Sequence, residues 1–145
     1  MTKYFTWGEF DKSVDYIANQ CKNLKLSGIY GVPRGGLCLA VALSHKLNVQ
    51  LIEKPLKSSL IVDDVYETGM TLSNFKNIEG VNFFVLVSKK KPIWWKAVNL
   101  SLKEEWIVFP WENKENEFKD EKEYKIGRAH VRTPVTSQSR MPSSA

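Results

Sequence analysis

The sequence predicts a single α/β domain with a parallel sheet, and three observations lead to this fold class. The chain has 145 residues, 43% hydrophobic and 26% charged, a size and composition typical of one compact domain. Helical and strand patterns alternate along it. The strand segments are continuously apolar, as in strands that a parallel sheet buries on both faces.

The first helix is expected at residues 7–23. Thr6 and Glu9 have the spacing of a capping box, in which each end of the pair satisfies a backbone N–H of the other. Apolar residues then recur at helical spacing, at Phe10, Val14, Ile17 and Cys21.

The later elements alternate between strand and helix. A strand at 28–33 precedes a helix that Gly35 and Gly36 open and that continues to Lys46. We expect further strands at 49–53, 60–64 and 81–88, and a short helix at 71–76. In parallel sheets ligands bind beyond the carboxyl ends of the strands, where the two glycine-containing turns of this chain lie.

The working domain is predicted to span residues 1–112. Residues 113–126 are mostly charged with mixed signs, which is typical of a solvated terminal helix or linker. Residues 127–145 lack apolar periodicity and are rich in Ser, Thr, Pro and Arg, so we interpret them as a disordered or non-native tail.

The formal net charge of +5 suggests an anionic partner at first sight. Three of the basic residues, Arg128, Arg132 and Arg140, belong to the tail, and the rest of the chain has 18 basic against 16 acidic residues. Bulk charge therefore does not favour nucleic acid as a partner.

Membrane insertion and secretion are not expected. The longest apolar runs are far shorter than the ~20 residues of a membrane helix, and no basic-then-apolar leader follows Met1. Cys21 and Cys38 are too few for a disulfide framework or a four-ligand zinc site. We therefore expect a cytoplasmic protein.

Residues 60–72 (LIVDDVYETGMTL) carry the strongest chemical signal. A buried strand ends in Asp63 and Asp64, and the following turn offers consecutive backbone N–H groups and the hydroxyls of Thr68 and Thr71 to an anion. Two carboxylates beside a phosphate would repel it unless they hold Mg²⁺ or bind sugar hydroxyls. This combination indicates a ribose phosphate; the alternative is an acidic turn with capping threonines.

This segment resembles the phosphoribosyl pyrophosphate (PRPP) signature of the type I phosphoribosyltransferases, a Rossmann-like fold. It departs mildly from the usual pattern at Glu67, where Asp is commoner, and at Met70, where a small residue is usual. The resemblance implies that Asp63 and Asp64 bind the ribose hydroxyls directly or through Mg²⁺, and that Glu67 is the catalytic acid or base. The residues implied to anchor the 5′-phosphate are Thr68, Gly69, Met70 and Thr71.

A second segment, residues 31–36 (GVPRGG), occupies the position of the family's pyrophosphate loop. The resemblance implies that Arg34, Gly35 and Gly36 bind pyrophosphate, with Arg34 neutralising its charge, and that the Pro33–Arg34 peptide bond is cis. By itself this turn is equally consistent with a plain helix start.

A third segment narrows the resemblance to the 6-oxopurine branch, in particular the short bacterial xanthine-guanine enzymes. Lys89 lies in a run of three lysines, and residues 106–112 read WIVFPWE. The resemblance implies that Lys89 donates to the purine O6, that Trp106 stacks on the base and that Ile107 offers backbone groups to its edge. Lys90 as the contact, a solvated lysine loop and a core role for Trp106 remain alternatives.

One departure concerns the lid. Family members carry a long flexible loop between the second and third strands, which excludes water from a reactive sugar cation; here only residues 54–59 separate those strands. The protein could be slow or leaky, borrow a lid from a partner subunit, or not be an enzyme. Residues 92–102, with Trp94 and Trp95, are either an exposed covering or oligomerising patch or an ordinary strand.

The sequence thus predicts a purine phosphoribosyltransferase that uses PRPP, a 6-oxopurine and Mg²⁺. The alternatives are a PRPP- or nucleotide-binding regulator of the same fold and a phosphoribosyltransferase for another base. Related enzymes are dimers or tetramers, so we expect a homodimer or homotetramer.

Overall fold

The computed structural model describes residues 2–112. Met1 lies outside the described residues, and so do the predicted charged segment 113–126 and the predicted tail 127–145.

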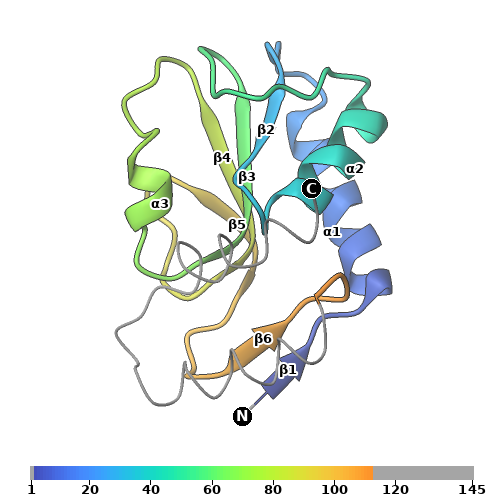
Figure 1. Cartoon of the computed structure of the whole chain (residues 1–145), viewed down its shortest axis with the longest axis vertical. Helices are drawn as coiled ribbons and strands as arrows, with labels where there is room; N and C mark the ends of the chain where they lie inside the picture. The colour runs from blue at the N-terminus through green and yellow to red at the C-terminus, as the bar shows by residue number, and fades with distance from the viewer. Residues whose placement is uncertain (1, 113–145) are drawn as a thin grey trace.

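A parallel sheet of four strands, in the order β2-β3-β4-β5, forms the centre of the domain (Figure 1). Its strands are β2 (Ile29–Gly31), β3 (Leu60–Tyr66), β4 (Asn82–Ser88) and β5 (Lys96–Leu100). Every neighbouring pair is parallel, and the register aligns Ile29 with Leu60 and Leu60 with Asn82. The predicted α/β fold with a parallel sheet is confirmed.

Helices cover both faces of this sheet. In Figure 1, α1 (Trp7–Cys21) and α2 (Leu37–Leu47) lie on one side, and the single turn of α3 (Met70–Ser73) lies on the other. The α1/α2 side encloses an aliphatic core that includes Ile17, Leu39 and Val62. The α3 side encloses a more aromatic core, which includes Tyr66, Leu72, Phe83 and Trp95.

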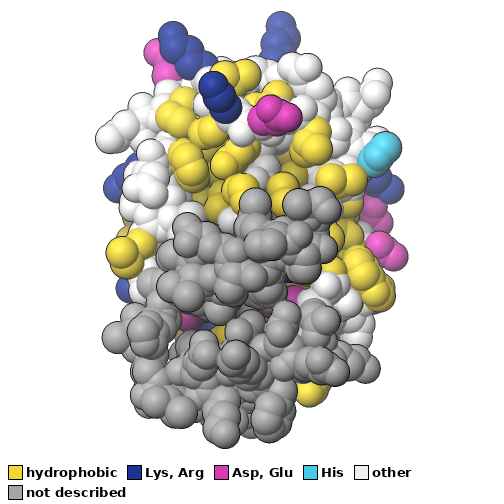
Figure 2. Space-filling view, viewed as in Figure 1, with side chains coloured by type: hydrophobic (Ala, Val, Ile, Leu, Met, Phe, Trp, Pro, Cys, Tyr) yellow, Lys and Arg dark blue, Asp and Glu magenta, His cyan; other side chains and the backbone are white. Residues whose placement is uncertain are grey.

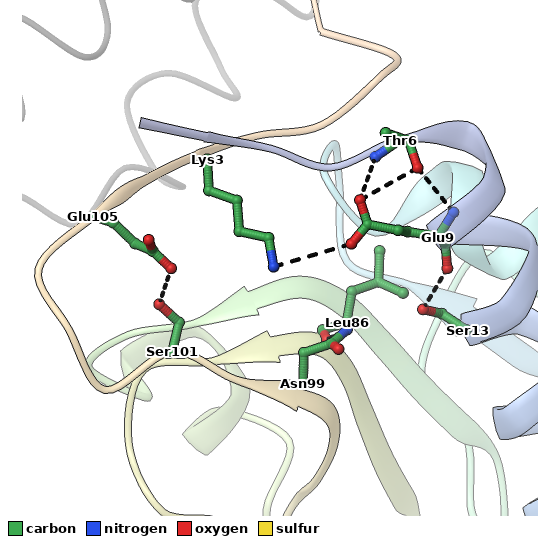
Figure 3. Close-up of polar contacts among 8 residues, drawn as sticks. All are labelled: Lys3, Thr6, Glu9, Ser13, Leu86, Asn99, Ser101 and Glu105. Carbon is green, nitrogen blue, oxygen red and sulfur yellow. Dashed lines mark hydrogen bonds and ion pairs between the residues drawn. The ribbon is translucent and has the colours of Figure 1, made fainter. Parts of the chain in front are cut away.

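The predicted capping box starts α1 (Figure 3). Thr6 Oγ1 accepts a hydrogen bond from Glu9 N at 3.0 Å, and Glu9 Oε1 accepts one from Thr6 N at 3.1 Å. Two backbone donors that the helix cannot satisfy itself are thereby paired.

A second, two-stranded sheet was not predicted. It pairs β1 (Thr2–Tyr4) with β6 (Trp106–Val108) in parallel, with Thr2 opposite Trp106. In Figure 1 this pair lies below the carboxyl ends of the main strands. Phe5 N extends the pairing by donating to Val108 O at 2.7 Å. The amino-terminal residues thus support the segment that carries Trp106.

The strand predicted at 49–53 is wrong. Only Leu51 forms a bridge, with Ile29, through the bonds Ile29 N to Gln50 O (2.9 Å) and Ile52 N to Ile29 O (3.0 Å). A single bridge does not make a ladder, and the Leu51 side chain is 48% exposed, so the apolar residues of this segment are not buried as those of a central strand are.

The short helix predicted at 71–76 is also shorter than expected. After the single turn of α3, the chain continues with bonds of the i to i−3 kind, such as Phe75 N to Leu72 O at 3.0 Å. This tighter winding ends the α-helix.

The short connection at 54–59 lies at the amino ends of the strands. Ser58 N donates to Glu79 O at 2.9 Å, and Ser27 N donates to Ser58 O at 3.0 Å. Glu79 and Ser27 precede β4 and β2, so these bonds fix the connection to the edge opposite the strands' carboxyl ends, the upper edge in Figure 1. It cannot act as the family's lid from there.

For the segment at 92–102, the structure supports the strand. Residues 96–100 form β5, and the Trp95 side chain is 4% exposed. Trp95 is therefore a core residue and not part of an exposed patch, whereas Ile93 is 86% exposed.

Some large apolar side chains remain at the surface. Figure 2, in the same view as Figure 1, shows hydrophobic side chains gathered over the upper half of the face turned to the viewer. Large apolar side chains that are exposed on α2 and on the chain after it are Leu37, Val41, Leu51 and Leu56. None of the helices within residues 2–112 is long and apolar enough to cross a membrane.

Candidate active site

The two predicted phosphate-binding segments meet at the carboxyl ends of β2 and β3. Gly35 lies against the Asp64 carboxylate: a Cβ atom at position 35 would be 2.6 Å from Asp64 Cγ and 2.8 Å from Oδ1. Real Cβ atoms do not approach other atoms so closely, so only glycine fits here without a shift of Asp64. The turn that carries Arg34 is thus held beside the acidic pair.

Gly36 is packed equally closely, but against backbone. A Cβ atom there would lie 2.8 Å from Val32 N and 3.0 Å from Asp63 Cα. Gly36 N donates to Val32 O at 2.8 Å and closes the turn, in which the Pro33–Arg34 peptide bond is cis, as the resemblance implies. Arg34 itself is half-buried.

Both acidic side chains are buried within β3, which continues to Tyr66, two residues beyond the predicted strand; Asp63 is 2% and Asp64 5% exposed. Each carboxylate accepts a hydrogen bond from the next residue: Asp64 N donates to Asp63 Oδ1 at 2.8 Å, and Val65 N donates to Asp64 Oδ1 at 2.7 Å. These bonds orient the side chains and help to offset the cost of burying them.

Tyr30 lies close to this acidic pair. Burial raises the pKa of its phenol, and the Asp63 carboxylate raises that pKa further. The phenol therefore stays neutral and able to donate a hydrogen bond beside the carboxylates. Tyr30 was not predicted as a site residue; its only signal was an aromatic residue within the strand that leads to the GVPRGG turn.

The predicted 5′-phosphate loop follows β3 directly. Glu67 is half-buried and Thr68 exposed, and Gly69 takes a positive φ of +80° at the start of α3. Met70 is 63% exposed, and Met70 N donates to Thr68 Oγ1 at 3.4 Å. Thr71 is half-buried within α3.

Lys89 joins this loop to the predicted base-binding segment. Its backbone N–H donates to Tyr66 O at 2.7 Å, next to Glu67, and its ammonium donates to the backbone carbonyl of Glu105. Ser101 Oγ donates to Glu105 Oε1 at 2.6 Å and fixes the turn that precedes β6 (Figure 3). Lys90, the alternative contact, is exposed.

Trp106 and Ile107 lie in β6, and each is 3% exposed. The Ile107 side chain packs in the aliphatic core, so its backbone is the part that could face a ligand. Because the Lys89 ammonium is hydrogen-bonded to the Glu105 carbonyl, the segment that carries Trp106 is held next to the end of β4.

The acidic pair offers a partial site for Mg²⁺. Within residues 2–112, no cluster of three or more His, Cys, Asp or Glu side chains could hold a metal ion. The oxygens of Asp63 and Asp64 are the hard ligands that Mg²⁺ prefers, and Mg²⁺ usually takes its other ligands from substrate phosphates and water. The donor set therefore fits Mg²⁺ brought in with a phosphorylated substrate.

Several solved structures share this fold. A purine phosphoribosyltransferase from Pyrococcus horikoshii matches with a TM-score of 0.65 and 30% sequence identity, over 77% of this chain and 95% of that one. A xanthine-guanine-hypoxanthine phosphoribosyltransferase from Helicobacter pylori gives a TM-score of 0.65 at 19% identity, over 82% and 99% of the two chains.

A more distant match is the APRTase from Giardia lamblia in complex with 9-deazaadenine, with a TM-score of 0.56 and 16% identity over 66% of this chain and 81% of that one. Comparisons with models of protein families and with curated protein sequences give no match.

The contact between Gly35 and Asp64 yields a stability prediction. Gly35→Ala should lower the free energy of unfolding by about 1–3 kcal/mol, because the new methyl group overpacks against the buried carboxylate. Gly8→Ala is the matched control: the nearest atom to a Cβ there is Thr6 Oγ1 at 3.8 Å, within α1. It should raise stability by about 0.5–1 kcal/mol. Urea denaturation measures both, and equal effects of the two variants would contradict the contact.

Proposed function

Because this chain belongs to the type I phosphoribosyltransferase family, we propose that it converts PRPP and a 6-oxopurine to the nucleoside 5′-monophosphate and pyrophosphate, a purine-salvage reaction. Members of this family are glycosyltransferases of the pentosyltransferase type. The observation that carries the proposal is the contact of Gly35 with the Asp64 carboxylate. It sets a turn suited to pyrophosphate beside a carboxylate pair suited to ribose.

In the proposed reaction the bond from C1′ to pyrophosphate breaks early and leaves an oxocarbenium-like ribose. Arg34 and the backbone of Gly35 and Gly36 bind the departing pyrophosphate and neutralise its charge. Asp63 and Asp64 hold the ribose hydroxyls and stabilise positive charge on the ring. Mg²⁺, when bound, supplies further neutralisation of the pyrophosphate charge.

The loop after β3 serves the remote end of the sugar. Thr68, Gly69, Met70 and Thr71 bind the 5′-phosphate, which provides binding energy away from the reacting carbon. Glu67 lies at the start of this loop. It follows Tyr66, whose backbone carbonyl accepts a hydrogen bond from Lys89 N. From there it handles the proton at the purine N7 as N9 attacks C1′.

The base is assigned to the segment around Lys89. Its ammonium suits the O6 carbonyl of a 6-oxopurine, and the backbone of Ile107 suits the ring edge. The indole of Trp106 suits the flat ring, but it is 3% exposed and can stack on a base only once it is uncovered. The bond from Lys89 to Glu105 supports this assignment, because it brings the lysine to the β6 segment.

A panel of bases tests the function. The protein is incubated with PRPP, Mg²⁺ and each of guanine, xanthine, hypoxanthine, adenine, uracil and orotate, and pyrophosphate release is measured. We expect release with one or more of the first three. Release with adenine or a pyrimidine alone would reassign the base, and PRPP binding without release would favour a regulator.

Glu67→Gln separates binding from catalysis. We expect the dissociation constant for PRPP to change by less than about threefold and kcat to fall by about 10²-fold or more, because general acid–base catalysis is worth that much. Glu53→Gln, at an exposed position just before the 54–59 connection, is the control and should leave both values unchanged. An unchanged kcat for Glu67→Gln would remove Glu67 from its role.

Two lysine variants decide which side chain contacts the base. Lys89→Met should lower kcat/KM for the 6-oxopurine by about 10- to 100-fold, the worth of a hydrogen bond to a charged donor, with little change in KM for PRPP. Lys90→Met, one residue along and exposed, should have no such effect. The reverse result would assign the contact to Lys90.

We further infer a homodimer or homotetramer. The exposed apolar side chains of Leu37, Val41, Leu51 and Leu56 support this inference, since burying large apolar side chains between subunits favours association.

A further inference from the structure

The ring of Tyr66 is held in place by an aromatic stack. Tyr66 ends β3 and is 7% exposed, and its ring lies parallel to the indole of Trp95, with centroids 3.6 Å apart and planes 12° apart. Trp94 meets the same ring edge-on at 5.9 Å. Trp95 Nε1 donates to Ser88 Oγ at 3.0 Å, which anchors the stack to the last residue of β4.

The loop that begins at Glu67 rests on this ring. A Cβ atom at Gly69 would lie 2.5 Å from Tyr66 Cζ and 3.0 Å from Cε2, so the backbone at Gly69 is in contact with the phenol. Gly69 also has the positive φ that turns the chain into α3. The Tyr66 ring therefore supports the loop at Gly69. The ring is itself held by its place at the end of β3 and by the stack with Trp95, which is hydrogen-bonded to β4.

We propose that Tyr66, stacked on Trp95, is a positioning residue that holds residues 67–71 in the shape that binds the sugar 5′-phosphate. The inference rests on the proposed function, in which this loop binds that phosphate. Small displacements of binding groups cost large factors in affinity and rate, so a rigid support under a short loop has a measurable effect.

Ligands that correspond to the two ends of PRPP distinguish a positioning role of Tyr66 from a general loss of folding. Ribose 5-phosphate tests the loop, and pyrophosphate with Mg²⁺ tests the turn at Arg34, which Tyr66 does not contact in the proposal. Tyr66→Leu removes the stacked ring and should weaken ribose 5-phosphate binding by about tenfold, with pyrophosphate binding changed by less than twofold. Tyr66→Phe keeps the ring and should stay within about threefold of the wild type for both ligands.

Titration calorimetry gives the dissociation constants, and thermal unfolding checks that each variant is folded. Tyr16→Leu, on an exposed position of α1, is the control and should alter neither constant. If Tyr66→Leu does not fold, Tyr66→Met, a longer and more adaptable side chain, replaces it.

An unchanged affinity of Tyr66→Leu for ribose 5-phosphate would overturn the inference, as would an equal loss for both ligands. The proposed function fails separately: if the wild type forms no nucleotide with any base but binds ribose 5-phosphate, and Tyr66→Leu weakens that binding selectively, the positioning role stands.

Discussion

The close packing of Gly35 and Gly36 on Asp63 and Asp64 of β3 is the constraint on which the site depends. The turn after β2 reaches the Asp64 carboxylate only because neither glycine has a side chain. Since β2 and β3 are adjacent and parallel, with Gly31 opposite Val62, their carboxyl ends deliver the turn and the acidic pair to the same place. The turn proposed to bind pyrophosphate and the carboxylates proposed to bind ribose are thereby held side by side.

The rest of the domain extends this arrangement outward. β4 continues the sheet, and Lys89 after it bonds to Tyr66 on one side and to Glu105 on the other. β1 pairs with β6 and holds the Trp106 segment across the carboxyl ends of the sheet. The connection at 54–59 lies at the opposite edge, so this connection does not exclude water from the site.

Much of this could be predicted from sequence, because the signals are local. The capping box of α1, the buried strands and the two motifs each depend on neighbouring residues, and the parallel order brings the motifs together. The β1–β6 pair could not be predicted, because its strands are too short to show a periodicity and its partners, such as Thr2 and Trp106, are 104 residues apart. The strand expected at 49–53 is wrong because apolar composition does not reveal that a segment forms a single bridge instead of a ladder of hydrogen bonds. The stack of Tyr66 on Trp95 and the hydrogen bond from Lys89 to the Glu105 carbonyl are tertiary contacts, which residue spacing in the sequence does not predict.

The most direct test of the central claim is a crystal structure of the protein with PRPP and Mg²⁺ bound. We predict pyrophosphate density against Arg34, Gly35 and Gly36, ribose hydroxyls at Asp63 and Asp64, and the 5′-phosphate within residues 67–71. Ligand density elsewhere on the domain, or pyrophosphate density away from the Arg34 turn at full occupancy, would contradict the account.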